Sequence, residues 1–130
     1  MTKVLFVCVE NSCRSQMAEG FGRRLGLDAH SAGSKPSGKV NPTAIAVMNE
    51  VGVDLSVNRS KSLAEAGSQG WDYVITMGCG DACPFVPSKA KRDWKIPDPK
   101  SMPLDEFRAV RDMIGKMVQE LADESRKPRA

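Results

Sequence analysis

The sequence predicts an α/β protein with a four-stranded parallel sheet in the order 2-1-3-4 and helices on both faces. Short apolar runs alternate along the chain with segments in which apolar residues recur every three or four positions. Strand-helix-strand connections of this kind are right-handed and produce parallel sheets, which bind ligands at the carboxyl ends of their strands. The 130 residues, 41% of them hydrophobic, are enough for a single domain over residues 1–130.

The first strand, residues 4–8, ends at Cys8, and a helix opens with Arg14 and Ser15 and ends near Gly26. The small and polar residues between them can curl so that successive backbone N–H groups point into one concavity beside the helix N-terminus. A concavity of this kind binds an oxyanion. We call it the cradle and assign it to Val9, Glu10, Asn11, Ser12, Cys13 and Arg14.

Cys8 is the predicted nucleophile of this segment. A thiol beside such a cradle loses its proton readily, Arg14 offers a planar fork to two oxygens of the anion, and Ser15 can donate its hydroxyl to the sulfur. The alternative is a buried cysteine that packs as a small hydrophobic side chain. We interpret Cys13 as structural, and Glu10 fits beside an anion only if its side chain points to solvent.

The remaining elements follow from the same patterns. Asn41 followed by Pro42 is a typical helix start, and the alternating spacings of three and four near the C-terminus predict an amphipathic helix. In chain order we expect a strand at 27–31, a helix at 41–52, a linker at 53–63 that leads into a short helix, a strand at 73–77, a weaker strand at 91–96 and a helix at 102–121.

The parallel sheet predicts that three segments meet at one edge. Cys8, the loop at 78–84 and Asp98 each follow a strand, and ligands bind at the carboxyl ends of strands. The loop carries Cys79 and Cys83, and a disulfide from either to Cys8 requires Cα atoms within about 7 Å. Asp98 lies between two prolines and is interpreted either as a general acid or as a turn residue.

Directly after the N-terminal strand, Cys8 is followed by five residues and then by Arg14-Ser15. This motif resembles that of the low-molecular-weight protein tyrosine phosphatase superfamily. The continuation Gln16-Met17-Ala18-Glu19-Gly20 is similar to the arsenate reductases built on that fold. The resemblance implies the same sheet order and extends over most of the chain. Further matching segments are residues 31–33, 41–45, 72–83, 94, 98–99 and 107–112.

This resemblance makes a thiol relay the leading functional hypothesis. Cys8 attacks arsenate while Asp98 protonates the leaving oxygen. Cys79 then attacks the Cys8 sulfur and releases arsenite, and Cys83 moves the disulfide to Cys79–Cys83, where thioredoxin reduces it. No tightly bound cofactor is expected.

Three alternatives remain open. Cys79 and Cys83 are closer together than the corresponding pair usually is in thioredoxin-linked reductases, which resembles branches that use a small thiol and a glutaredoxin-like protein. A phosphotyrosine phosphatase would use Cys8, Arg14 and Asp98 in the same way, but Lys100 stands where those phosphatases carry tyrosine. A non-catalytic redox or oxyanion sensor would retain the fold without turnover.

A potassium site known in part of this family is matched at three ligand positions, Asn11, Glu19 and Ser31. The nearby acidic position of that site corresponds to Lys61. We therefore hypothesise that the Lys61 ammonium replaces the cation and pairs with Glu19.

Composition restricts the partners and the compartment. The net charge of +3 is modest and the basic residues lack interleaved aromatic side chains, so we expect no nucleic-acid partner. The sequence shows no signal peptide and no run long enough to span a membrane, which predicts a cytoplasmic protein, and we expect a monomer. Four cysteines in a reducing compartment indicate chemistry or metal binding, and their spacing lacks the two-residue knuckle typical of zinc sites.

Overall fold

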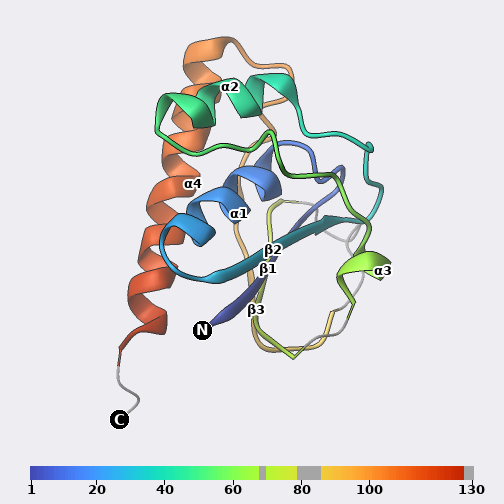
Figure 1. Cartoon of the computed structure of the whole chain (residues 1–130), viewed down its shortest axis with the longest axis vertical. Coiled ribbons are helices and arrows are strands. Elements are labelled where there is room, and N and C mark those ends of the chain that lie inside the picture. The colour runs from blue at the N-terminus through green and yellow to red at the C-terminus, as the bar shows by residue number, and fades with distance from the viewer. Residues whose placement is uncertain (68–69, 79–85, 128–130) are drawn as a thin grey trace.

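The structure is a computed structural model that describes residues 1–67, 70–78 and 86–127. Its four strands form one parallel sheet in the order β2-β1-β3-β4, which confirms the predicted fold class (Figure 1). The elements are, in chain order, β1 (Lys3–Cys8), α1 (Arg14–Arg24), β2 (Asp28–Gly33), α2 (Pro42–Glu50), α3 (Leu63–Ala66), β3 (Trp71–Thr76), β4 (Ser88–Asp93) and α4 (Leu104–Ser125).

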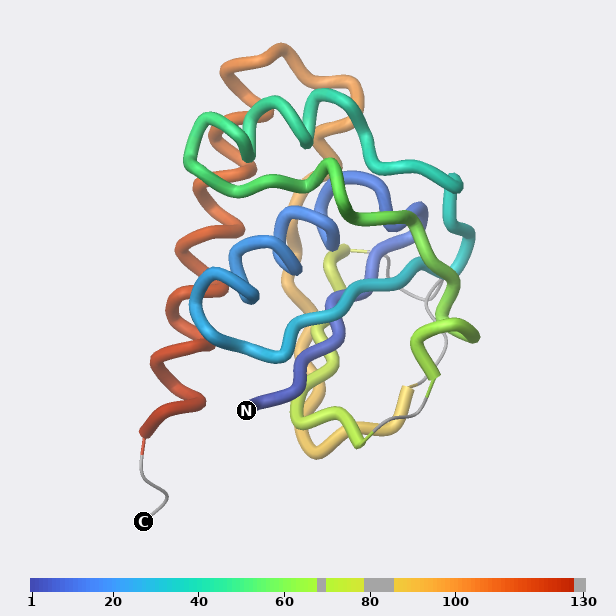
Figure 2. The backbone as a smooth tube through the Cα atoms, in the orientation of Figure 1, coloured from blue at the N-terminus to red at the C-terminus, as the bar shows by residue number. Residues whose placement is uncertain are grey.

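Helices cover both faces of the sheet. Helices α1, α2 and α4 lie on one side and α3 on the other, as the backbone trace in Figure 2 shows. Successive side chains of β1 point to opposite faces, so Phe6 belongs to the core under α1 and α4, whereas Leu5 and Val7 belong to the smaller core beside α3. Because β1 is buried on both faces, its apolar run is continuous rather than alternating.

The fourth strand differs from its predicted position. It covers Ser88–Asp93 instead of residues 91–96, and its side chains alternate between half-buried and exposed because it lies at the edge of the sheet. The apolar residues Trp94 and Ile96, which suggested a later strand, are buried after the strand has ended. The predicted strand was placed too late because these two apolar residues are buried in the loop that follows the strand.

The helices agree better with their predicted positions. The Asn41 side chain accepts hydrogen bonds from the backbone N–H groups of Thr43 and Ala44, so it caps α2 as expected. Helix α4 continues one turn beyond its predicted end, to Ser125. Among the described residues, no helix has the length and apolar character needed to cross a membrane.

Close backbone approach at the end of β2 shapes the edge of the sheet where the cradle lies. Gly33 pairs with Cys8 in register, and a Cβ at Gly33 would lie 2.5 Å from the Val9 carbonyl oxygen and 2.9 Å from the Asn11 nitrogen. A side chain there would push the backbone of residues 9–11 outwards. Glycine therefore allows the first residues of the cradle to pack directly against β2.

Candidate active site

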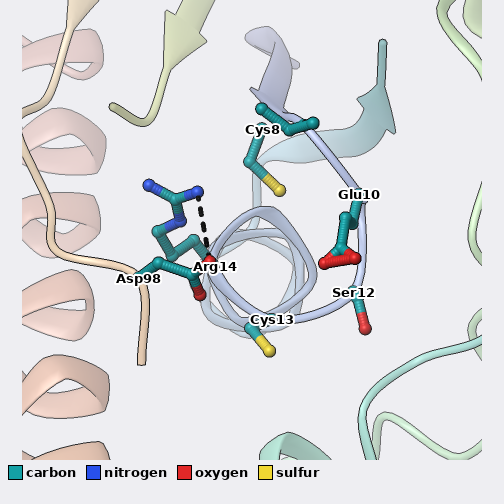
Figure 3. Close-up of a pocket in the computed structure, with 7 residues that line it drawn as sticks. Cys8, Glu10, Ser12, Cys13, Arg14 and Asp98 are labelled. Carbon is teal, nitrogen blue, oxygen red and sulfur yellow. Dashed lines mark ion pairs between the residues drawn. The ribbon is translucent and has the colours of Figure 1, made fainter. Parts of the chain in front are cut away.

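The predicted cradle surrounds a cavity of about 280 Å³ at the carboxyl end of β1. Figure 3 shows the N-terminus of α1 at its centre, with Asp98 on one side and Glu10 on the opposite side. Asn11 and Ser15, also predicted for the site, are fully buried and are not part of the lining. The lining residues are Cys8, Val9, Glu10, Ser12, Cys13, Arg14 and Asp98.

The start of α1 provides the polar end of the cavity. The helix begins at Arg14, as predicted, with Cys13 at its N-cap position. Within the part of the chain that the structure describes, no side chain caps this terminus. The first-turn N–H groups and the helix dipole therefore favour an anion at this end of the helix.

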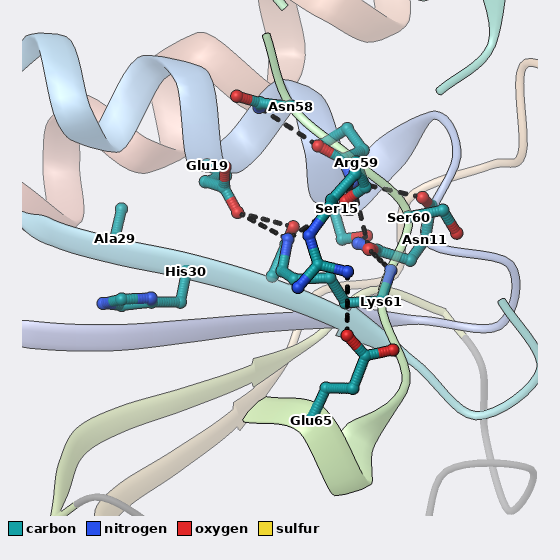
Figure 4. Close-up of polar contacts among 12 residues, drawn as sticks. Asn11, Ser15, Glu19, Ala29, His30, Asn58, Arg59, Ser60, Lys61 and Glu65 are labelled. Atoms are coloured by element: carbon teal, nitrogen blue, oxygen red, sulfur yellow. Dashed lines mark hydrogen bonds and ion pairs between the residues drawn. The ribbon is translucent and has the colours of Figure 1, made fainter. Parts of the chain in front are cut away.

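Asn11 fixes the conformation of the cradle. Its backbone is left-handed, with φ of 50°, and its Nδ2 donates to Ser15 Oγ over 2.8 Å. Its Oδ1 accepts from Gln16 Nε2 at 3.0 Å and from the backbone nitrogen of Lys61 at 2.8 Å. These contacts tie the cradle both to α1 and to the distant linker before α3 (Figure 4).

Ser15 links this network to the nucleophile. Its Oγ lies 2.8 Å from Cys8 Sγ, in a buried contact. Because Ser15 Oγ already accepts the hydrogen bond from Asn11, its own hydrogen is available to the sulfur. Ser15 can therefore hold the Cys8 sulfur in place by a hydrogen bond at the end of β1.

Two backbone carbonyls hold the Arg14 guanidinium in place. Nη1 donates to the oxygen of Met77 at 2.6 Å and to that of Ile96 at 3.1 Å, and Nη2 lies 3.9 Å from Asp98 Oδ2. Gly78 permits this arrangement, since its φ is 81° and a Cβ would lie 2.9 Å from Arg14 Nη1. Arg14 thus connects the cradle to Met77, just after β3, and to Ile96, two residues before Asp98.

The second thiol of the cavity is a poor nucleophile. Burial raises the pKa of Cys13 to about 12, and the negative charges of Asp98 and Cys8 act in the same direction. Cys13 is therefore protonated at neutral pH, although it lines the same cavity as Cys8. This agrees with its interpretation as a structural residue.

Glu10 does not simply point to solvent. Its two carboxylate oxygens accept hydrogen bonds from Lys100 Nζ at 2.8 and 2.9 Å, while the residue lines the cavity. The backbone nitrogen of Lys100 also donates to Asp98 Oδ1 at 3.1 Å. The ammonium of Lys100 therefore neutralises the carboxylate that the sequence alone left unexplained.

The hypothesised contact between Lys61 and Glu19 is present. Glu19 is buried, Lys61 Nζ lies 3.6 Å from its Oε1, and Arg23 Nη2 lies 3.1 Å from its Oε2. Ser31 Oγ donates to Oε1 over 2.7 Å. Two cations therefore surround the buried Glu19 carboxylate. Figure 4 shows Glu19 and Lys61 in the same region as Asn11.

Two predicted relay residues, Cys79 and Cys83, lie outside the described residues. Within the described part of the chain, no three side chains of His, Cys, Asp or Glu are grouped so that they could hold a metal ion.

Sequence reasoning missed the contacts that cross between distant segments. In the sequence, Lys100 was noted only because related phosphatases carry tyrosine at this position. In the structure it pairs with Glu10, 90 positions earlier. The carbonyls of Met77 and Ile96 that hold Arg14, and the backbone of Lys61 that holds Asn11, have no side-chain signature in the sequence. Gly33 and Gly78, which follow the predicted second and third strands, were available signals, because a glycine allows other groups to approach its backbone closely.

The fold and this site define a protein of the low molecular weight phosphotyrosine protein phosphatase type, and residues 3–130 match that family. A glutaredoxin arsenate reductase from Synechocystis sp. is 42% identical over 126 residues, covering 93% of this chain and 96% of that protein. A solved structure described as an arsenate reductase in the phosphate binding state superposes with a TM-score of 0.86 at 40% identity, covering 95% of this chain and 98% of that one. A thioredoxin-dependent arsenate reductase from Corynebacterium glutamicum superposes with a TM-score of 0.76 at 34% identity, covering 95% of this chain and 61% of that one.

The chain therefore belongs to the arsenate reductases of the low molecular weight phosphotyrosine protein phosphatase family. The resemblance inferred from the cradle sequence is confirmed.

Proposed function

We propose that this protein reduces arsenate to arsenite by attack of the Cys8 sulfur on arsenate held in the cradle. The observation that carries the proposal is the buried contact between Cys8 Sγ and Ser15 Oγ at the base of a cavity that Arg14 and Asp98 also line. A nucleophile, a cation for the anion and a carboxyl group for the leaving oxygen converge there. These are the groups that displacement at a tetrahedral oxyanion requires.

In the first step the Cys8 sulfur forms a bond to arsenic while one As–O bond breaks. Asp98, in its protonated form, gives its proton to the departing oxygen, which leaves as water. Arg14 and the N–H groups of the cradle stabilise the charge on the remaining oxygens. The product is a covalent adduct between Cys8 and pentavalent arsenic.

The second step reduces the arsenic. A thiolate, assigned to Cys79, attacks the Cys8 sulfur, so that a disulfide forms, the S–As bond breaks and its electron pair stays on arsenic, which leaves as arsenite. Cys83 then attacks Cys79, giving a Cys79–Cys83 disulfide and restoring Cys8. The assignment of both residues rests on the sequence alone, in which they follow the segment that forms β3.

The electron donor must reduce the disulfide between Cys79 and Cys83 that the proposed relay leaves. We assign it to thioredoxin, which reduces a disulfide between two protein thiols directly. A glutaredoxin-like protein with a small thiol is the alternative, favoured by the short spacing between Cys79 and Cys83. The relatives include proteins named for each donor.

A coupled assay tests the function and the donor together. The purified protein is incubated with arsenate, thioredoxin, thioredoxin reductase and NADPH, and NADPH oxidation is followed. We expect sustained turnover, and a loss of at least about a hundredfold in Cys79→Ser and in Cys83→Ser, because each lacks a sulfur that must form a disulfide.

The parallel reaction with a small thiol, glutaredoxin and its reductase separates the two donors. Turnover only in this second reaction, with Cys83→Ser still active, would replace the three-cysteine relay by resolution of the adduct with a small thiol. Absence of arsenite in both reactions would refute the reductase assignment itself.

The same cradle accepts phosphate, so slow hydrolysis of an activated phosphate ester is expected beside arsenate reduction. Cys8 would attack phosphorus and Asp98 would protonate the departing ester oxygen, by the same geometry. The absence of a tyrosine after Pro99 leaves an aromatic ester little to stack on. We therefore assign ester hydrolysis as a side reaction.

Potassium is expected to have no specific effect on this protein. The buried Glu19 carboxylate already faces the ammonium of Lys61 at 3.6 Å and the guanidinium of Arg23 at 3.1 Å, so a third cation would be repelled. Thermal unfolding and phosphate binding measured in potassium and in sodium chloride at equal ionic strength should coincide. A melting temperature several degrees higher in potassium, in the range that about 1 kcal/mol produces, would contradict the replacement of the cation by Lys61.

A further inference from the structure

The ion pair between Glu10 and Lys100 joins two segments that border the cavity on different sides. Glu10 belongs to the cradle, and Lys100 follows Asp98 by two residues. Glu10 and Asp98 both line the cavity and lie on opposite sides of the α1 N-terminus (Figure 3). The Lys100 side chain therefore reaches from the Asp98 side to the Glu10 side.

Both ends of this connection are held in place by the backbone. The carbonyl oxygen of Glu10 accepts hydrogen bonds from the backbone nitrogen of Ser37 and from Ser60 Oγ, each at 3.0 Å. At the other end, the backbone nitrogen of Lys100 donates to Asp98 Oδ1 at 3.1 Å. Because hydrogen bonds hold the backbone at both residues, the two side chains lose less conformational freedom on pairing than two side chains on a flexible surface would.

The pair is also closer to solvent than the base of the cavity is. The side chain of Lys100 is 55% exposed and that of Glu10 is 35% exposed, whereas Cys8 at the base is almost fully buried. An anion bound against Cys8 therefore lies deeper in the cavity than this ion pair, of which Glu10 is the member that lines the cavity. We call this contact the Glu10–Lys100 bridge.

We propose that the Glu10–Lys100 bridge is a specificity determinant that favours inorganic tetrahedral oxyanions over phosphate monoesters. The inference rests on the proposed function, because it assumes that the cavity holds an oxyanion. An inorganic anion such as arsenate or phosphate is small enough to stay beneath the bridge. The substituent of a monoester must extend towards solvent, where it displaces the Lys100 ammonium from Glu10 and leaves the carboxylate uncompensated beside an anion.

The charges of the bridge make single substitutions poor tests of this effect. Lys100→Ala leaves the Glu10 carboxylate unpaired beside the cavity, so it weakens the binding of inorganic anions and esters alike. Glu10→Ala frees an ammonium and strengthens the binding of both. The double variant Glu10→Ala with Lys100→Ala removes the bridge and keeps the net charge of the wild type, and its phosphate affinity reports the effect of losing the Glu10 side chain from the cavity lining.

The test compares two ligands in the same variants. The ratio of kcat/KM for 4-nitrophenyl phosphate to the association constant of inorganic phosphate measures the preference for the ester. In the double alanine variant this ratio should rise about three- to tenfold. This is the change in rate that corresponds to the free energy of an exposed ion pair, about three- to tenfold. The variant Glu10→Gln with Lys100→Gln keeps the chain lengths and should show a smaller rise. The double variant Asp72→Ala with Lys89→Ala removes another ion pair, also keeps the net charge and is distant from the cavity, so it should leave the ratio unchanged.

A ratio that stays at its wild-type value in both double variants overturns the proposal, as does a ratio that falls. Phosphate binding in each variant reports whether the cradle is intact, so a folding defect is distinguished from a change in preference. Failure of the proposed function has another signature: the wild type would bind no phosphate, or Cys8→Ser would hydrolyse the ester at the wild-type rate. Either result also removes the basis of the bridge proposal.

Discussion

Replacing Cys8 by serine is expected to abolish arsenate reduction, with a fall in rate of at least about a thousandfold. A serine hydroxyl is not ionised at neutral pH and cannot form the disulfide that reduces arsenic, so both chemical steps are lost. The substitution is small and the cavity keeps Arg14 and the cradle, so phosphate binding should persist. NADPH oxidation in the coupled assay measures the first effect, and calorimetric titration with phosphate measures the second.

Cys13→Ser is the matched control, because Cys13 lines the same cavity. Its thiol stays protonated at neutral pH, since burial raises its pKa to about 12. Serine at this position therefore removes no nucleophile, and the rate should fall by less than about tenfold. If Cys13→Ser were inactive and Cys8→Ser active, the two sulfurs would have to exchange roles in the mechanism.

The cradle could be predicted from the sequence because its parts are contiguous. A buried strand, a turn of small and polar residues and a helix start follow one another between residues 4 and 20, and local patterns report each of them. The position of Asp98 at the same edge followed from the parallel sheet alone. The predicted order of strands was sufficient to bring it to the cavity that Cys8 and Arg14 line.

What the sequence could not predict are the contacts that depend on distant backbone atoms. Lys61 holds Asn11 through its backbone nitrogen, and Met77 and Ile96 hold Arg14 through their carbonyls. Any residue type supplies these groups, so no pattern marks them. The displacement of β4 has a different origin, because Trp94 is buried by packing of its ring against the Phe6 ring and not by membership of a strand.

The Glu10–Lys100 bridge was only partly predictable from the sequence. Both residues are charged and visible in the sequence, but 90 positions separate them and many other charges were available as partners. The chemistry of the site indicated that the Glu10 charge needed an explanation. Only the fold, which places residues 98–100 beside the cradle, identifies the partner that neutralises it.

Asn11→Ala is expected to lower the free energy of unfolding by about 3–5 kcal/mol. Two effects combine. The left-handed backbone at φ of 50° is unfavourable for alanine, and the partners Ser15, Gln16 and Lys61, of which the first two are buried, each lose a hydrogen bond. Ser15 loses the donor that orients its hydroxyl towards Cys8, so phosphate binding should weaken as well. Urea unfolding and calorimetric titration with phosphate measure the two changes.

Asn11→Gly separates the two effects, because glycine adopts the left-handed conformation without a penalty and lacks the amide. It should recover about 1–2 kcal/mol relative to alanine, which is the backbone contribution, while the loss of hydrogen bonds remains. The weakening of phosphate binding should be shared by both variants if the amide network holds the cradle in shape. Equal stability of the alanine and glycine variants would show that the backbone at residue 11 carries no strain. Wild-type phosphate affinity in both would show that the cradle keeps its shape without the Asn11 side chain.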